Sequence, residues 1–249
     1  MTVISKGYIL PSRPNFRDLG GISVRNGRTI RHGLVFRSGD LFSLKPEDMP
    51  RLESAGLRTI IDFRSDPEVS RRPDDLLPTV THRIHLPINE ATHDFDPKTI
   101  NESQPEDFLH VLADDYRLIV RRQTAAFRKF FEIIQDPGHL PVVYHCAAGK
   151  DRTGLATWFL LSALDVPEEV IRADYLATNV FAKDLADKII AKTNEKGIRG
   201  EVIRPFLEVR NEYIDAALDE IETSYGGMDL FLAHQVGADK ELLRKIFLS

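Results

Sequence analysis

Cysteine is almost absent from this chain, with Cys146 as the single example among 249 residues. One thiol excludes an internal disulfide, and it fits a reducing compartment in which a reactive thiolate is protected from oxidation. Tryptophan is equally scarce, since only Trp158 is present. Trp158 stands in an apolar run after the cysteine, which predicts a core position.

Long apolar runs are also missing. No stretch approaches the ~20 residues that a transmembrane helix needs, and residues 1–6 lack the apolar segment of a signal peptide. We therefore expect a cytoplasmic protein without stable membrane insertion; export that needs no signal peptide is compatible with this expectation. Excess positive charge is missing too, because the formal net charge is −5. That balance argues against nucleic-acid binding and requires any anion site to concentrate positive charge locally.

Several sequence patterns of known chemistry are absent. The chain has no Gly-x-Ser-x-Gly elbow and no Walker-type phosphate loop. His82 and His85 are three positions apart on a predicted strand, so their side chains point to opposite faces and do not converge on a metal. The sequence predicts no metal and no cofactor.

The strongest positive signal surrounds the one cysteine, where residues 145–154 read HCAAGKDRTG. They follow an apolar, β-type run at 140–144 and precede a helical run at 155–164. A loop that opens a helix directs backbone N–H groups into one concavity and carries partial positive charge. A thiol nucleophile needs that field, since an unperturbed thiol titrates near pH ~8.5. The same N–H groups would receive phosphate oxygens, so the pattern predicts a loop that binds inorganic phosphate or a phosphate ester.

Charged and small residues of the loop fit this chemistry. The guanidinium of Arg152 offers a planar fork that can hold two phosphate oxygens, which a lysine cannot do. Lys150 adds a second positive charge. Gly149 permits a positive φ and a close approach of substrate.

The remaining loop residues have predicted supporting roles. Thr153 can offer its hydroxyl to the cysteine sulfur, and Gly154 permits close packing of the new helix. His145 is predicted to brace the loop through hydrogen bonds. The predicted substrate-binding residues are therefore His145, Ala147, Ala148, Gly149, Lys150, Thr153 and Gly154.

This string resembles the signature of the cysteine-dependent protein-tyrosine phosphatases. Its GKDRTG ending resembles a bacterial and fungal branch, the tyrosine/serine phosphatases. The resemblance implies Cys146 as the nucleophile and Arg152 as the phosphate binder, with hydrolysis through a phosphocysteine intermediate and no metal. It spans nearly the whole chain, because five further segments agree with it: residues 14–21 (PNFRDLGG), 35–39 (VFRSG), 60–65 (IIDFRS), 173–176 (ADYL) and 223–226 (TSYG).

The resemblance also bears on the substrate. It implies that Lys150 and Asp151 lie at the mouth of the site, and that Lys150 admits phosphoinositides as well as phosphoproteins. The expected partner is thus a phosphorylated protein or a phosphoinositide. Asn15, Arg17 and Asp18 match the N-terminal motif of the family and are expected to be scaffold around the loop.

The proton donor for the leaving group is open. Asp151 ranks first because it lies in the loop, although neighbouring cations favour its ionised form and make it a poorer acid; pairing with those cations is its structural alternative. Glu90 ranks second, because it stands where some relatives carry an acidic residue after a Leu-Pro segment. Asp94 and Asp96 follow on the same predicted loop, which could close over substrate or simply be solvated. Asp62, at the end of a predicted strand, is a further candidate.

The periodicity predicts an α/β fold with a central, mainly parallel sheet flanked by helices. Strands are expected at 29–36, 57–62, 79–86 and 140–144. Helices are expected at 44–55, with Ser43 as N-cap, and at 106–135. We expect a single phosphatase domain over 1–249, with a helical region at about 165–249 packed on the α/β core and Gly226 ending its last long helix. Residues at about 180–200 lie near the loop mouth and are either a lid or ordinary scaffold.

One rival from another functional class shares the loop. A phosphoprotein or phosphoinositide binding module without turnover would keep Arg152 and the loop but would need no acid. An arsenate reductase needs further thiols for its relay, which this chain does not have. The sequence does not indicate an oligomeric state.

Overall fold

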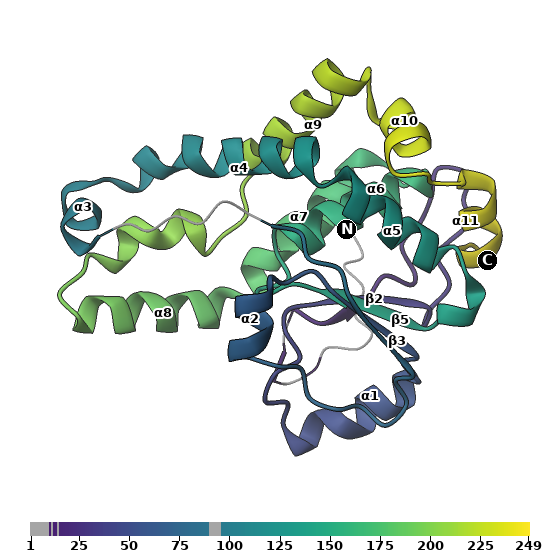
Figure 1. Cartoon of the computed structure of the whole chain (residues 1–249), viewed down its shortest axis with the longest axis horizontal. Coiled ribbons are helices and arrows are strands. Elements are labelled where there is room, and N and C mark those ends of the chain that lie inside the picture. The colour runs from purple at the N-terminus through teal and green to yellow at the C-terminus, as the bar shows by residue number, and fades with distance from the viewer. Residues whose placement is uncertain (1–9, 11, 14, 90–95) are drawn as a thin grey trace.

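A five-stranded sheet forms the centre of the molecule (Figure 1). The computed structural model describes residues 10, 12–13, 15–89 and 96–249. One edge strand is antiparallel to its neighbour and the other pairings are parallel, which confirms the predicted α/β class. From edge to edge the strands are β1 (Arg17–Asp18), β2 (Val35–Ser38), β5 (Val142–His145), β3 (Thr59–Asp62) and β4 (His82–His85).

Both faces of the central strands are buried. In β5, Tyr144 belongs to the larger of two apolar clusters and Val143 to the smaller. In β3, Ile61 belongs to the larger cluster and Ile60 to the smaller one. Because successive side chains of a strand point to opposite faces, a strand covered on both sides is apolar at nearly every position. The continuous apolar runs in the sequence reflect this double burial.

Helices cover both faces of the sheet (Figure 1). The smaller cluster includes side chains of α1, and the larger one includes side chains of α5, α6, α7 and α11. No helix among the described residues is both long and apolar enough to cross a membrane. The longer helices are α1 (Met49–Ala55), α4 (Leu109–Arg122), α5 (Thr124–Ile134), α6 (Arg152–Ala163), α7 (Glu168–Phe181), α9 (Asn211–Tyr225) and α11 (Lys240–Phe247).

An arm projects from the sheet at the left of Figure 1. Its elements are tied by hydrogen bonds such as that from the Arg199 backbone N–H to Asn101 Oδ1, at 2.8 Å. α8 buries only Ala186 and Ile190. The arm consists of α3 (Pro97–Glu102), α8 (Lys183–Glu195), the 3-10 helix η4 (Gly200–Phe206) and the first turns of α4.

Short elements complete the chain. A helical turn, α2, follows β3 and is important for the site described below. The set comprises α2 (Asp66–Arg71), α10 (Met228–Leu230), the 3-10 turns η1 (Pro46–Asp48), η2 (Pro105–Phe108) and η3 (Pro137–His139), and a π-helical turn, η5 (Phe231–Gln235).

Two predicted helices differ from the structure. The helix expected at 44–55 is η1 followed by α1, and Ser43 is not its N-cap but a residue with φ +56°. The helix expected at 106–135 breaks at Gln123, whose φ and ψ are −113° and 18°. The break has a packing reason, because α4 runs along α9 while α5 packs into the core beside the sheet.

Two strands are shorter than the sequence predicted, whereas the predicted end of one helix is confirmed. Of the strand expected at 29–36, only the end belongs to β2, and Thr29 and Ile30 form isolated bridges instead. The strand expected at 79–86 shortens to β4. Gly226 does end α9, in the left-handed conformation with φ +77°. Trp158 is 2% exposed, as a core residue should be.

Candidate active site

The cysteine loop joins β5 to α6. Cys146 directly follows β5, the strand between β2 and β3 at the middle of the sheet, and is 2% exposed. The carboxyl ends of parallel strands form the edge at which α/β proteins bind ligands. α6 begins at Arg152, three residues earlier than the sequence predicted. The loop therefore lies at a helix N-terminus, where the first N–H groups have no acceptor within the helix.

The carbonyl groups of the loop are bound from outside. Asn15 Nδ2 donates to the carbonyls of Ala148 and Gly149, both at 3.0 Å. Arg37 Nη2 donates to the Gly149 carbonyl at 2.9 Å. Because the C=O and N–H of a trans peptide point in opposite directions, carbonyls held on the outside direct the loop amides inward.

A buried carboxylate, Asp174 of α7, holds the two arginines behind the loop. Asp174 Oδ1 lies 2.8 Å from Arg17 Nε and its Oδ2 lies 2.6 Å from Arg37 Nη1. Burial alone would raise the pKa of Asp174, but the charges of Arg17 and Arg37 outweigh it and lower the pKa. Arg17 Nη1 also donates to Asn15 Oδ1, at 2.5 Å. The family-like segments at 14–21, 35–39 and 173–176 therefore meet in one network under the loop.

Two glycines of the loop have steric reasons to be glycine. Gly149 has φ +71°, as predicted, and a Cβ there would lie 2.4 Å from the Ser38 carbonyl oxygen. A Cβ on Gly154 would lie 3.2 Å from the Tyr175 ring. The first glycine sets the turn of the loop, and the second lets α6 pack closely against α7.

Arg152 is held by a residue that the sequence analysis missed, Glu68 of α2. Arg152 Nη1 donates to Glu68 Oε2 and Nη2 to Oε1, each at 2.8 Å. Burial would raise the pKa of Glu68, but the hydrogen bonds and charge of Arg152 outweigh it and lower the pKa to about 2. The pair fixes the plane of a guanidinium that is 5% exposed. The sequence did not indicate this role. Glu68 forms a capping box with Ser65 at the start of α2, and that local function is sufficient to explain a glutamate at this position.

Asp151 and Lys150 form a pair beside the loop. Lys150 Nζ lies 2.8 Å from Asp151 Oδ2, and Tyr116 donates its hydroxyl to Asp151 Oδ1 at 2.7 Å. Tyr116 also contacts the Tyr175 hydroxyl at 2.9 Å. Burial is the main reason why the pKa of Tyr116 is raised well above its ordinary value, so its hydroxyl stays a donor to Asp151. Tyr116 lay within the apolar periodicity of α4, and nothing in the sequence marked it as a site residue.

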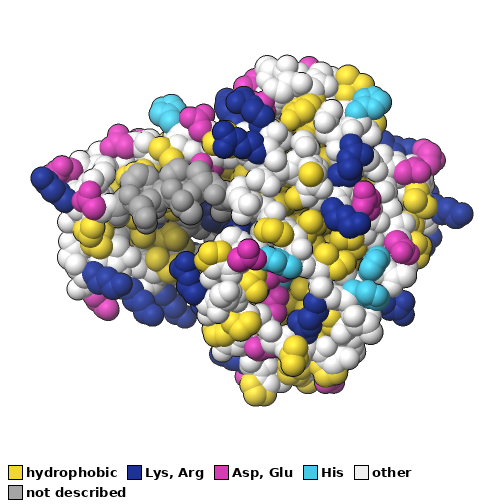
Figure 2. Space-filling view, in the orientation of Figure 1, with side chains coloured by type: hydrophobic (Ala, Val, Ile, Leu, Met, Phe, Trp, Pro, Cys, Tyr) yellow, Lys and Arg dark blue, Asp and Glu magenta, His cyan; other side chains and the backbone are white. Residues whose placement is uncertain are grey.

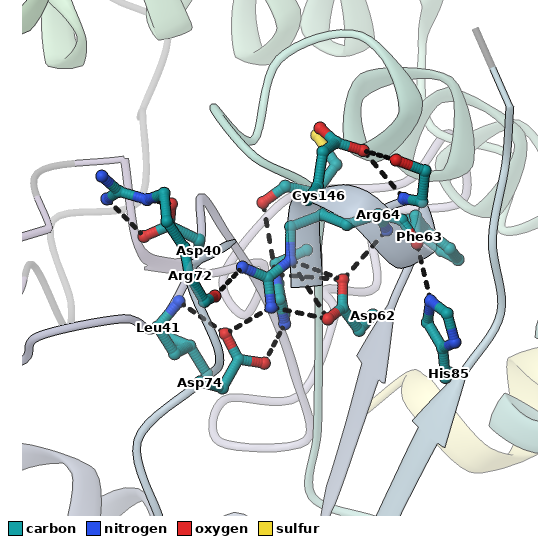
Figure 3. A network of polar contacts seen from close by, with 12 residues as sticks. Asp40, Leu41, Asp62, Phe63, Arg64, Arg72, Asp74, His85 and Cys146 are labelled. Carbon is teal, nitrogen blue, oxygen red and sulfur yellow. Dashed lines mark hydrogen bonds and ion pairs between the residues drawn. The ribbon is translucent and has the colours of Figure 1, made fainter. Parts of the chain in front are cut away.

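A second polar network, with Asp62, Arg64 and Asp74, lies close to Cys146 (Figure 3), and His145 belongs to it. His145 Nε2 lies 2.9 Å from Asp74 Oδ2, and its Nδ1 lies 3.2 Å from the carbonyl oxygen of Cys146. Arg64 Nη2 contacts both Asp74 Oδ1 at 2.9 Å and Asp62 Oδ2 at 2.6 Å. Burial would raise the pKa of Asp74, but His145 and Arg64 outweigh it and lower the pKa. The histidine ring is thus fixed through both of its nitrogens.

The same network contains a possible set of metal ligands and the candidate proton donor Asp62. Asp62, Asp74 and His145 lie close enough together to be considered as metal ligands. The guanidinium of Arg64 already bonds both carboxylates and supplies the positive charge between them. Asp62 binds Arg64 through both oxygens and is 7% exposed, so it is an ion-pair partner in this structure. Its candidacy as proton donor stays a prediction.

A further candidate, Asp96, lies in the arm, apart from the loop. Asp96 accepts hydrogen bonds from the Lys98 and Thr99 N–H groups as the N-cap of α3, in the arm. Hydrogen bonds from Thr99 lower the pKa of Asp96, which favours a carboxylate. Glu90, together with Asp94, lies outside the described residues.

Thr153 does not make its predicted contact. Its hydroxyl is buried and has no hydrogen-bond partner among the described residues, the Cys146 sulfur included. The hydroxyl lies on the first turn of α6, directly after Arg152. A role of Thr153 toward the sulfur stays a prediction.

Comparisons with known proteins agree on one family. A family model described as the tyrosine phosphatase family matches residues 8–248. A Cupriavidus necator protein, provisionally assigned as a tyrosine-protein phosphatase, is 33% identical over 94% of this chain and 86% of its own length. The triple specificity protein phosphatase PtpB of Mycobacterium tuberculosis is 28% identical over 90% of this chain and 91% of its own length.

Among solved structures, one match is the catalytic domain of the PP-IP phosphatase Siw14 from S. cerevisiae, in complex with citrate. The TM-score is 0.37 at 15% identity, over 68% of this chain and 75% of that chain.

Proposed function

The chain belongs to the tyrosine phosphatase family, and from this premise we propose that it hydrolyses phosphate monoesters through a phosphocysteine intermediate on Cys146. The observation that carries the proposal is the position of Cys146 between the end of β5 and the start of α6, with Arg152 held in plane by Glu68. A thiol at a helix N-terminus beside a guanidinium lies in a positive field. That field stabilises the negative charge on the three phosphate oxygens.

In the first step, the Cys146 thiolate attacks phosphorus. The S–P bond forms as the bond from phosphorus to the ester oxygen breaks, and the departing oxygen takes a proton. The loop amides and Arg152 stabilise the equatorial oxygens of the transferring group. We assign the proton to Asp151 first, because it lies in the loop, and to Glu90 second.

In the second step, water replaces the cysteine. The acid that gave its proton to the leaving group takes one from water, the new O–P bond forms, and the S–P bond breaks to release phosphate and the thiolate. Thr153 is the proposed hydrogen-bond donor to the departing sulfur. The loop then holds inorganic phosphate as the product.

Phosphotyrosine is the first substrate that we propose, with phosphoserine, phosphothreonine and phosphoinositides as further ones. The mycobacterial relative PtpB is a triple specificity protein phosphatase. In this chain, Lys150 lies in the loop itself, with its Nζ 2.8 Å from Asp151 Oδ2. The single cysteine also supports action in the cytoplasm, where thiols stay reduced.

The first prediction concerns the nucleophile. Cys146→Ser is expected to abolish hydrolysis of p-nitrophenyl phosphate, since a hydroxyl is not ionised in this field. The wild-type protein is expected to keep its turnover in EDTA, and mass spectrometry of acid-quenched reactions with Asp151→Asn to detect a phosphorylated Cys146. Full activity of Cys146→Ser would refute the mechanism. Tight binding of phosphopeptides by the wild-type protein without phosphate release would instead identify a binding module.

A further inference from the structure

A cleft of about 400 Å³ lies beside the cysteine loop, and the function of the loop does not account for it. Ala147 and Ala148 form the part of its wall that belongs to the loop. The opposite wall comes from the end of α7 and the start of α8, with Phe181 and Leu185. Its charged lining residues are Arg13, Asp40, Lys45, Arg72, Asp184 and Lys188.

The charge of this cleft is positive. Four cationic side chains face two acidic ones. Asp40 is neutralised inside the cleft, since it lies 2.9 Å from Arg72 Nε and 3.7 Å from Arg13 Nη2. In a chain with a net charge of −5, this is a local concentration of positive charge.

Lys45 and Lys188 supply positive charge in addition to the arginines that pair with Asp40. Lys45 lies 3.8 Å from Glu47, and both side chains are largely exposed, so their mutual attraction is weak. Lys188 lines the cleft from α8. Figure 2 shows Lys and Arg side chains gathered over α8, at the lower left of the molecule. An anion that entered the cleft would meet ammonium groups from two separate elements.

We propose that this cleft is a second anion subsite, which takes an additional phosphate of a substrate whose first phosphate is held by the cysteine loop; the inference rests on the proposed function. The substrate class is a compact polyphosphate, namely an inositol ring with phosphates on adjacent carbons. Lys45 and Lys188 bind the additional phosphate. Arg72 and Arg13 form its positive wall, held in place by Asp40.

The geometry favours one small scaffold over a doubly phosphorylated peptide. The cleft and the loop share Ala147 and Ala148, so both phosphates must come from neighbouring positions. Successive side chains of an extended peptide point to opposite sides, whereas a ring presents adjacent phosphates together. The apolar part of the lining is compatible with an attached lipid, because Leu185 lines the cleft and is 56% exposed.

The test compares substrates that differ by one phosphate. The soluble pair is inositol 1,4-bisphosphate and inositol 1,4,5-trisphosphate; the lipid pair is the short-chain phosphatidylinositol 4-phosphate and 4,5-bisphosphate. For the wild-type protein, kcat/KM should be roughly tenfold higher for the more phosphorylated member. In Lys45→Glu/Lys188→Glu that ratio should fall to about one. Lys183→Glu is the control, since Lys183 lies on the same helix but pairs with Asp187, outside the cleft.

Each outcome decides the proposal. A gain in both pairs identifies the headgroup as the ligand, and a gain in the lipid pair alone identifies a membrane lipid. Equal kcat/KM within both pairs, or a ratio that Lys45→Glu/Lys188→Glu leaves intact, overturns the subsite. So does a gain that appears only with a doubly phosphorylated peptide.

A binding measurement on a variant without the catalytic cysteine tests the subsite independently of the proposed function. Isothermal titration calorimetry with Cys146→Ser should show tighter binding of inositol 1,4,5-trisphosphate than of the 1,4-bisphosphate, and adding the two lysine substitutions should remove the difference. If the wild-type protein turned over no substrate but this difference persisted, the proposed function would fail and the subsite would stand. Equal affinities overturn the subsite whatever the turnover.

Discussion

At the residue scale, the predicted phosphate binder Arg152 depends on a carboxylate from another part of the chain. Both of its terminal nitrogens donate to Glu68, and the two residues are 84 positions apart in sequence. A charged, two-point contact fixes direction as well as charge. Glu68 is therefore a positioning residue for Arg152.

Removal of the Glu68 charge tests this role. Glu68→Gln should lower kcat/KM for p-nitrophenyl phosphate by roughly ten- to a hundredfold, the range expected for losing a charge-assisted hydrogen bond. The effect should fall mainly on kcat, because orientation matters most in the transition state. Asp66→Asn, on the same helix and with a side chain that is 90% exposed, is the matched control and should leave kinetics unchanged. Equal kinetics for Glu68→Gln and the wild-type protein would contradict the role.

The lowered pKa of Glu68 also predicts a pH dependence of stability. Its pKa falls from 4.5 to about 2 on folding, so the folded state favours the carboxylate. The stabilisation is complete above the unfolded pKa and is lost as the pH falls from about 5 toward 2. The difference in unfolding free energy between the wild-type protein and Glu68→Gln should be constant between about pH 5 and 7 and shrink at about pH 3. Urea unfolding at the three pH values measures it, and a difference that stays constant down to pH 3 would exclude the linkage.

At the element scale, the sequence predicted best where neighbours in the chain determine the structure. The β5–loop–α6 unit and the end of α9 at Gly226 depend on local signals, namely an apolar run, a glycine-containing loop and a left-handed stop. The break at Gln123 had no such signal. Its cause is that α4 and α5 pack against different partners, which periodicity along one segment does not reveal.

We predict that α8 is sensitive to proteolysis. It lines the cleft beside the loop, and only two of its residues, Ala186 and Ile190, are buried. Trypsin should cut α8 early, since Lys183 and Lys188 are exposed on it. Orthovanadate bound in the loop should slow this cleavage if α8 closes over the site. Cleavage at Lys240, at the start of α11, is the internal control. Unchanged cleavage of α8 with vanadate would identify it as ordinary scaffold.

At the scale of the whole molecule, the sequence predicted the cysteine loop but not the residues from other segments that hold the loop in place. The fold class and the loop position followed from the sequence, since strand, loop and helix are consecutive. Glu68, Asp74 and Tyr116 were missed because they reach the loop from α2, a connecting segment and α4. Partners so distant in sequence become neighbours only in the folded chain, and a single sequence has no signal for such pairs.

The bridge made by Asp174 has a consequence for how the chain can be divided. α7 reaches across the sheet edge to neutralise one arginine on β1 and another on β2. A chain shortened before α7 would bury two guanidinium groups with no counter-ion, which is a far larger penalty than the loss of ordinary packing. We therefore expect residues 1–167, although they contain all five strands of the described sheet and the cysteine, to be unable to form a folded unit without the helices that come after them.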